Sequence, residues 1–105
     1  MKLIYIAHPL RNDPDFNKEK LSEILRNNFK SYQEMHVLPI SPIHTFGYLD
    51  PKVDVMSECL ELLSYCDELW VFGDWKHSTG ACEEIGFALR NGIKIRYIEG
   101  EKDNG

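Results

Sequence analysis

The stretch Leu69-Trp70-Val71-Phe72, followed directly by Gly73-Asp74, decides the fold. An uninterrupted apolar run that ends in turn residues predicts a short strand buried on both of its faces. Downstream, a helical spacing of apolar residues predicts a helix over residues 79–91, ended by Gly92. The inward positions of that helix are Ala81, Ile85, Ala88 and Leu89. A further apolar run predicts a strand over residues 93–98.

Upstream of this stretch, the sequence predicts two further pairs, each made of a strand followed by a helix. A helix is expected to begin at Pro51 with Asp50 as its cap, because proline suits the first helical position and aspartate suits the cap. A strand is predicted over residues 37–40 and a helix over residues of roughly 15–31. The apolar stripes of the two helices are Met56, Cys59, Leu60 and Leu63, and Leu21, Ile24, Leu25 and Phe29.

The first strand is predicted over residues 3–7, where His8-Pro9 ends it. The resulting order is β-α-β-α-β-α-β, which predicts an α/β, three-layer Rossmann- or flavodoxin-like fold. Its sheet has four parallel strands, and three helices cover both faces. The whole chain, residues 1–105, is expected to be one domain with a polar, frayed tail over residues 99–105.

Composition excludes several classes of function. The 105 residues carry a formal net charge of -5, which argues against binding to a nucleic-acid backbone. Three cysteines without a paired spacing argue against a disulfide framework or a structural zinc site and favour the cytoplasm. No apolar run approaches the length of a membrane span. No dinucleotide fingerprint or P-loop occurs, so no cofactor is expected. No His-x-x-x-His pattern or Cys/His cluster indicates a metal site.

The most informative segment for chemistry begins at Ser78-Thr79-Gly80 and includes Glu84. Small and hydroxyl residues at a helix start leave backbone N–H groups available for an anion. Glu84 is predicted near that start, where the helix dipole would favour an ionised carboxylate. Such a carboxylate serves as a nucleophile or stabilises a developing cation. The plain alternative is an acidic residue placed there by the dipole alone.

At this point the sequence resembles the nucleoside 2-deoxyribosyltransferase superfamily. The resemblance includes the opening strand and its proline, Tyr5 to Pro9, and the apolar strand before Gly73. Its most specific part is a glycine followed by glutamate, an apolar residue, glycine and alanine, here Gly80, Glu84, Ile85, Gly86 and Ala88. The resemblance covers nearly the whole chain and is nearest to small bacterial and phage members.

The resemblance implies N-glycosidic chemistry, with Glu84 as the nucleophile that attacks the anomeric carbon of a 2-deoxyribonucleoside. Transferases of this superfamily usually carry aspartate two residues before the motif glycine, whereas deoxynucleoside 5'-monophosphate N-hydrolases carry serine. Ser78 therefore favours a nucleotide, because a hydroxyl beside helix N–H groups accepts a phosphate that aspartate would repel. Arg11 is a second candidate for contacting that phosphate.

These arguments give a set of expected substrate-binding residues around Glu84. A nucleoside or nucleotide is the expected ligand, and Phe46 and Trp75 are candidates for stacking on its base. A homodimer or larger homo-oligomer is expected, because a small sheet has two open edges. The expected substrate-binding residues are Tyr5, His8, Pro9, Arg11, Gly73, Asp74, Ser78 and Gly80.

Two other functions stay open at the level of sequence. Longer members of the superfamily continue into a fifth strand, and His8 replaces the small residue usual after the first strand. Both departures are compatible with a non-catalytic nucleotide-binding module, such as a sensor or a sponge. The third reading is a structural partner subunit that binds no nucleotide.

Overall fold

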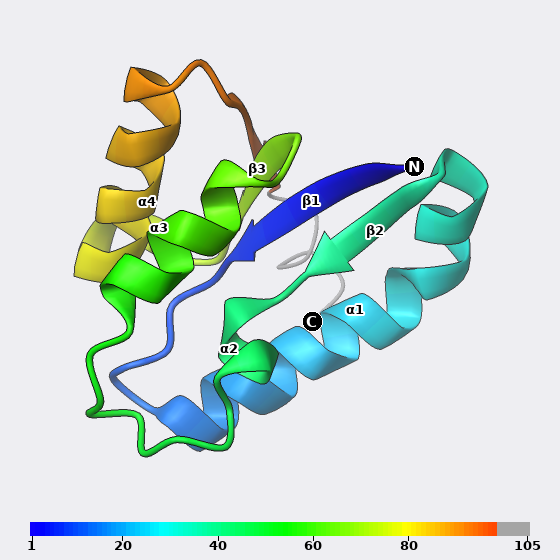
Figure 1. The fold of residues 1–105 in the computed structure, drawn as a ribbon. Helices are drawn as coiled ribbons and strands as arrows, with labels where there is room; N and C mark the ends of the chain where they lie inside the picture. The colour runs from blue at the N-terminus through cyan, green and yellow to red at the C-terminus, as the bar shows by residue number, and fades with distance from the viewer. Residues whose placement is uncertain (99–105) are drawn as a thin grey trace.

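The computed structural model describes residues 1–98, so the frayed tail predicted for residues 99–105 lies outside the described residues. Strands and helices alternate along the chain as expected, with a short extra helix and a 3-10 turn (Figure 1). The elements are β1 (Lys2–Ala7), α1 (Pro14–Met35), β2 (Val37–Ile40), α2 (Pro42–Thr45), α3 (Met56–Ser64), β3 (Glu68–Phe72), the 3-10 turn η1 (Trp75–His77), α4 (Thr79–Arg90) and β4 (Lys94–Ile98).

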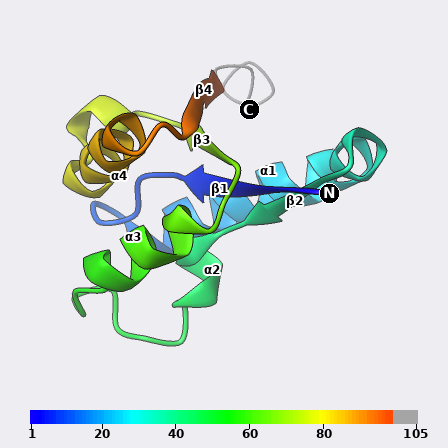
Figure 2. The same cartoon turned by 45° about the horizontal axis from the view of Figure 1, so that its top comes forward.

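The four strands form one parallel sheet in the order β2-β1-β3-β4. β1 lies at its centre, where Tyr5 pairs with Ile40 on one side and with Leu69 on the other. The helix α1 covers one face of the sheet, and α3 and α4 cover the other (Figures 1 and 2). The predicted three-layer α/β fold is therefore confirmed.

Side chains alternate between the two faces along each central strand, as the pleat requires. In β1, Ile4 and Ile6 pack toward α1, whereas Tyr5 and Ala7 pack toward α3 and α4. The four residues of the apolar run, Leu69 to Phe72, are buried as predicted, and Glu68 at the start of β3 is buried as well. Within residues 1–98, no helix is both long and apolar enough to cross a membrane.

The first helix extends beyond its predicted end. The side chain of Asp13 caps it by accepting a hydrogen bond from the backbone of Phe16 at 3.2 Å. It continues to Met35 and ends at His36 in the left-handed conformation, with a φ of 59°. Phe29, expected to face inward, is exposed, and Tyr32 is buried in its place. Tyr32 lies two turns beyond Ile24 and so continues the buried stripe.

Two other expectations about the helices were wrong. The second long helix begins at Met56 rather than at Pro51. The carboxylate of Asp50 accepts a hydrogen bond from the backbone of Lys52 at 2.9 Å, so it closes a turn instead of capping a helix. In α4, Leu89 is exposed, because Ile85 and Ala88 already fill the side that faces the sheet.

Candidate active site

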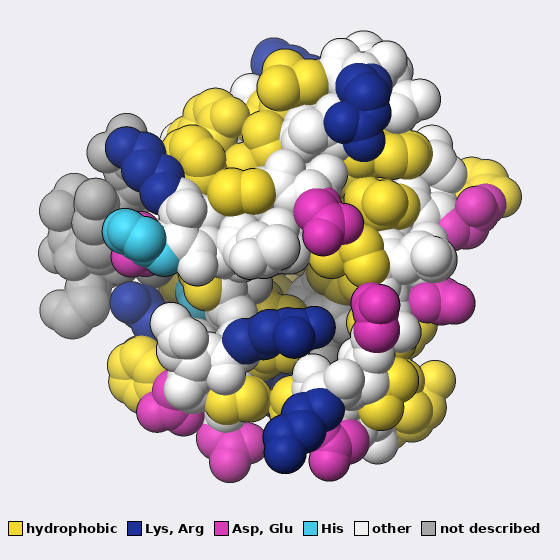
Figure 3. All heavy atoms as spheres, turned by 90° about the vertical axis from the view of Figure 1, so that its left-hand side faces the viewer, with side chains coloured by type: hydrophobic (Ala, Val, Ile, Leu, Met, Phe, Trp, Pro, Cys, Tyr) yellow, Lys and Arg dark blue, Asp and Glu magenta, His cyan; other side chains and the backbone are white. Residues whose placement is uncertain are grey.

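A large cavity lies beyond the carboxyl ends of the strands, where parallel α/β sheets commonly bind ligands. Its volume is about 870 Å³, and its walls come from the loop after β1, the α2 region and the start of α4. Figure 3 looks onto this edge of the molecule and shows a central hollow crossed by Lys or Arg side chains, with Asp and Glu side chains around its rim. The cavity is large enough for a nucleotide.

Glu84 is the buried carboxylate of this cavity. It is the sixth residue of α4 and only 7% exposed, and it lies at the cavity wall. The hydroxyl of Tyr5, which is fully buried in β1, donates a hydrogen bond to Oε2 of Glu84. Because Tyr5 is on the central strand and Glu84 on the covering helix, the contact fixes the carboxylate against the rigid sheet.

Burial controls the charge of Glu84. It raises the pKa of the Glu84 carboxyl to about 7, a rise that the Tyr5 hydrogen bond opposes and the neighbouring Glu83 charge increases. The expectation that the helix start would favour the ionised form was wrong, because the dipole acts mainly within the first turn and Glu84 lies beyond it. Near neutral pH, a proton is therefore gained and lost readily at this carboxylate.

Tyr5 and Cys59 complete the surroundings of the carboxylate. Burial, followed by the charge of Glu84, raises the pKa of the Tyr5 hydroxyl, so Tyr5 keeps its proton and acts as a donor. Burial also raises the pKa of the Cys59 thiol, which interacts with Tyr5 and lines the cavity. The sequence places Cys59 on the apolar stripe of a helix, a signal for core packing, and this obscured its place at the cavity.

Ser78 is the N-cap of α4. Its hydroxyl oxygen accepts a hydrogen bond from the backbone of Ala81 at 3.2 Å. Ser78 and Gly80 both line the cavity, which places the start of α4 where a ligand meets it. A cap uses the serine as an acceptor, so the hydroxyl proton stays available for an anionic ligand.

The loop after β1 brings His8, Pro9 and Arg11 to the same cavity. Nδ1 of His8 lies 2.8 Å from the carbonyl oxygen of Pro9, and a carbonyl only accepts, so Nδ1 carries the proton. Within residues 1–98 the guanidinium of Arg11 makes no ion pair, which leaves it available to an anion.

Two of the expected substrate-binding residues after β3, Gly73 and Asp74, are not among the described residues that line the cavity. Asp74 pairs at 2.9 Å with Nδ1 of His77, which does line it. Trp75 packs on Tyr97 with ring centroids 5.1 Å apart and also lies outside that lining. Of the two aromatic side chains considered for base stacking, Phe46 is the one that reaches the cavity.

Neither glycine of the motif lies against the backbone of another element. At Gly86, the atom nearest to an added Cβ would be Nη1 of Arg90 in the same helix, at 3.3 Å. At Gly80, a Cβ would meet only the methyl end of Met56, at 3.4 Å.

Gly73 supports the site indirectly through its backbone. Its φ of +70° is in the left-handed region, and a Cβ there would lie 3.1 Å from Cδ of Pro9. Gly73→Ala is expected to lower the free energy of unfolding by about 1–2 kcal/mol from backbone strain, with about 1 kcal/mol more from displacing Pro9. Chemical denaturation measures the loss.

Gly92→Ala is the matched control for that substitution. Gly92 has a φ of +69°, but nothing lies within 4 Å of a Cβ built there, so only the backbone strain applies. Equal losses in the two variants would contradict the role assigned to the contact between Gly73 and Pro9.

Among residues 1–98, no group of three or more His, Cys, Asp or Glu side chains is arranged to hold a metal ion. The polar groups that line the cavity include the buried Glu84 carboxylate, the start of α4, the His8 imidazole and the Arg11 guanidinium.

Comparisons with known proteins agree with this architecture. A family model described as "Domain of unknown function (DUF7768)" matches residues 2–98. Among curated proteins, no sequence matches this chain. A solved structure described as "2-desoxiribosyltransferase from Leishmania mexicana" superposes with a TM-score of 0.68 at 20% identity.

That superposition covers 93% of this chain and 64% of the Leishmania mexicana chain, so this chain spans less than two thirds of its structural neighbour. At 20% identity the likeness concerns the fold. The fold implied by the resemblance to the nucleoside 2-deoxyribosyltransferase superfamily is therefore confirmed.

Proposed function

The chain belongs to the family of the domain of unknown function DUF7768, and we propose that it acts on the N-glycosidic bond of a nucleoside or deoxynucleoside 5'-monophosphate. The observation that carries the proposal is the Glu84 carboxylate, which is buried at the cavity wall and held by the Tyr5 hydroxyl. The likeness in fold to a 2-desoxiribosyltransferase supports the same class of reaction.

In the proposed reaction, the ionised Glu84 attacks the anomeric carbon of the sugar. The new bond joins a carboxylate oxygen to that carbon, while the bond from carbon to the base nitrogen breaks and its electron pair leaves with the base. The base takes up a proton from water, and the sugar stays bound to Glu84 as an ester. Water or a second base then displaces the carboxylate, giving hydrolysis or transfer.

The geometry around Glu84 suits this role. Tyr5 hydrogen-bonds Oε2, which orients the carboxylate and leaves Oε1 for the sugar carbon. A buried carboxylate without a cationic partner interacts strongly with the positive charge that develops on the sugar in the transition state. Ser78 and Arg11 lie at the same cavity and would contact the 5'-phosphate.

The second candidate is a nucleotide-binding module without turnover. The pKa of about 7 favours it to the extent that a large share of Glu84 is protonated at neutral pH and is then not nucleophilic. On this reading Glu84 would donate or accept a hydrogen bond to the ligand, and no bond would break.

The decisive experiment measures release of free base from a panel of nucleosides and 5'-monophosphates, in ribose and deoxyribose forms, by chromatography. Wild type and Glu84→Gln are compared in parallel. Release by wild type alone supports the glycosidic reaction. A ligand that raises the melting temperature of both proteins with no base released by either supports the binding module.

A substitution at Ser78 tests the phosphate. Ser78→Asp keeps a side chain that caps helices well but adds a negative charge where the phosphate would bind. We expect its KM for a deoxynucleoside 5'-monophosphate to rise at least about tenfold, because a charge-assisted hydrogen bond is replaced by repulsion. The KM for the matching nucleoside, which has no phosphate, should change little. An equal rise for both substrates would place the phosphate elsewhere.

A further inference from the structure

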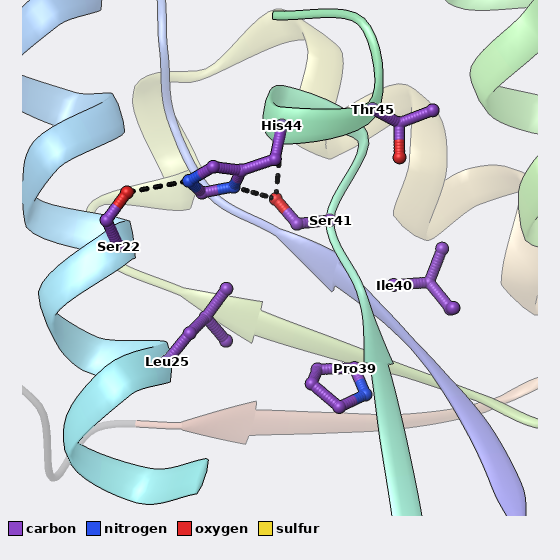
Figure 4. Close-up of a pocket in the computed structure, with 7 residues that line it drawn as sticks. All are labelled: Ser22, Leu25, Pro39, Ile40, Ser41, His44 and Thr45. Atoms are coloured by element: carbon purple, nitrogen blue, oxygen red, sulfur yellow. Dashed lines mark hydrogen bonds between the residues drawn. The ribbon is translucent and has the colours of Figure 1, made fainter.

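The short helix α2 stands between two cavities. Pro42, Ile43, Phe46 and Gly47, which we call the α2 wall, line the large cavity of the active site. On its other side a smaller cavity of about 400 Å³ lies between α2, α1 and β2, and His44 crosses it (Figure 4). The same short segment therefore shapes the active-site cavity on one side and contacts α1 on the other.

His44 joins α2 to α1 through two serine hydroxyls. Nε2 of His44 lies 2.6 Å from Oγ of Ser22, and Nδ1 lies 2.7 Å from Oγ of Ser41 (Figure 4). The Ser22 hydroxyl donates its proton to the carbonyl oxygen of Lys18 at 2.9 Å. It must therefore accept from His44, so the proton of the imidazole lies on Nε2 and Nδ1 accepts from Ser41.

This assignment makes His44 neutral, with one donor and one acceptor, both used. Ser41 is buried and caps α2, since its hydroxyl oxygen also accepts from the backbone N–H of His44 at 3.3 Å. A four-residue helix is not stable by itself, so its position depends on such contacts. The backbone packs closely after α2 as well, because a Cβ at Gly47 would lie only 2.9 Å from the carbonyl oxygen of Ile43.

We propose that neutral His44 is a positioning residue that holds the α2 wall against α1, and that its protonation releases the wall and weakens substrate binding. The part that concerns substrate rests on the proposed function; the part that concerns the wall does not. His44 itself is exposed, so protons reach it from solvent.

Protonation conflicts with the observed hydrogen bonds. A proton on Nδ1 would point at the Ser41 hydroxyl, which now donates to that atom, so Ser41 would have to turn its proton away within a buried setting. The charged groups that act on His44 are both on α1. Partial burial, followed by the charge of Lys18, lowers the pKa of His44, while the charge of Glu19 raises it. The β2 residues that line the same cavity as His44, Pro39 and Ile40, carry no charge.

Hydrogen–deuterium exchange of residues 41–47 against pH, corrected for the intrinsic rate, tests the wall without any substrate. In wild type we expect protection at pH 7.5 and a loss of roughly tenfold at pH 5. His44→Gln offers one donor and one acceptor that do not titrate, so its corrected protection should not change with pH. His44→Ala should be weakly protected at both values.

His36→Asn is the matched control, because His36 is a second exposed histidine, at the end of α1, and asparagine tolerates its left-handed backbone. It should keep the wild-type pH dependence. A wild-type protein whose protection does not change with pH, or a His44→Gln variant that follows wild type, would overturn the proposal.

Kinetics give the second readout. As the pH falls from 7.5 to 5, the KM for a deoxynucleoside 5'-monophosphate should rise several-fold more in wild type than in His44→Gln. The two proteins should share one pH profile of kcat. Identical KM profiles would overturn the effect on substrate. If no base is released at all, the proposed function fails, whereas the exchange experiment still decides the role of His44.

Discussion

Glu84→Gln is expected to lower base release by about 10³-fold or more while leaving the fold intact. Glutamine has nearly the same shape as glutamate and still accepts the hydrogen bond from Tyr5, so the buried contact is kept. What it lacks is the negative charge that attacks the sugar carbon and stabilises the developing cation. The loss should therefore fall on kcat, with little change in the affinity for a nucleoside.

Glu83→Gln is the matched control, because Glu83 is the adjacent carboxylate and is exposed to solvent. It should keep most of the activity, with a small shift of the pH profile toward acid, since the Glu83 charge raises the pKa of Glu84. Activity in Glu84→Gln comparable to that of wild type would exclude Glu84 as the nucleophile.

The dependence of wild-type kcat/KM on pH also tests whether ionised Glu84 is the nucleophile. A nucleophilic carboxylate must be ionised, so kcat/KM should rise with pH through about 7 as Glu84 loses its proton.

The fold could be predicted from the sequence because its strongest signals are local. The fully buried β3 follows from an apolar run of a length that suits a strand, and Gly92 stops α4 through its positive φ. The helix boundaries were predicted wrongly where the same residues suit two local structures. Asp50 and Pro51 have the chemistry of a helix start and also that of a turn, and the region before Met56 forms a turn.

The candidate site was predictable only in part, because a motif identifies residues but not their surroundings. Glu84 and Ser78 could be singled out from their spacing, and both line the cavity. The shifted pKa of Glu84 could not be foreseen, since it depends on burial against a strand about 80 residues away in sequence. The bridge through His44 was missed for the same reason: Ser41 and His44 have the spacing of a helix cap, but Ser22 is distant in sequence.

The second large effect concerns stability, since the burial that prepares Glu84 for chemistry also opposes folding. The folded-state pKa of about 7 is above the ordinary value of 4.5, so the folded protein holds a proton that the unfolded chain releases. The contribution of Glu84 to the free energy of unfolding is thus fully present below pH 4.5 and falls as the pH rises toward 7. The loss is on the order of 3 kcal/mol, from the size of the shift. Glutamine does not titrate, so Glu84→Gln should gain stability relative to wild type by that amount between pH 4.5 and 8.

Chemical denaturation of both proteins across this pH range measures the difference, and Glu68→Gln provides a control of opposite sign. Glu68 is also buried, but its carboxylate accepts hydrogen bonds from Trp70 Nε1 at 2.9 Å and Lys2 Nζ at 3.2 Å, and these lower its pKa. Its contribution is present above pH 4.5 and lost as the pH falls, so Glu68→Gln should lose stability relative to wild type as the pH rises. Equal slopes for the two variants would contradict the assignment. Opposite slopes would mean that the two buried carboxylates have different roles. Glu68, at the amino end of the sheet, is stabilised by its hydrogen bonds. Glu84, near the carboxyl end, is left with too few to offset its burial, as a reactive group requires.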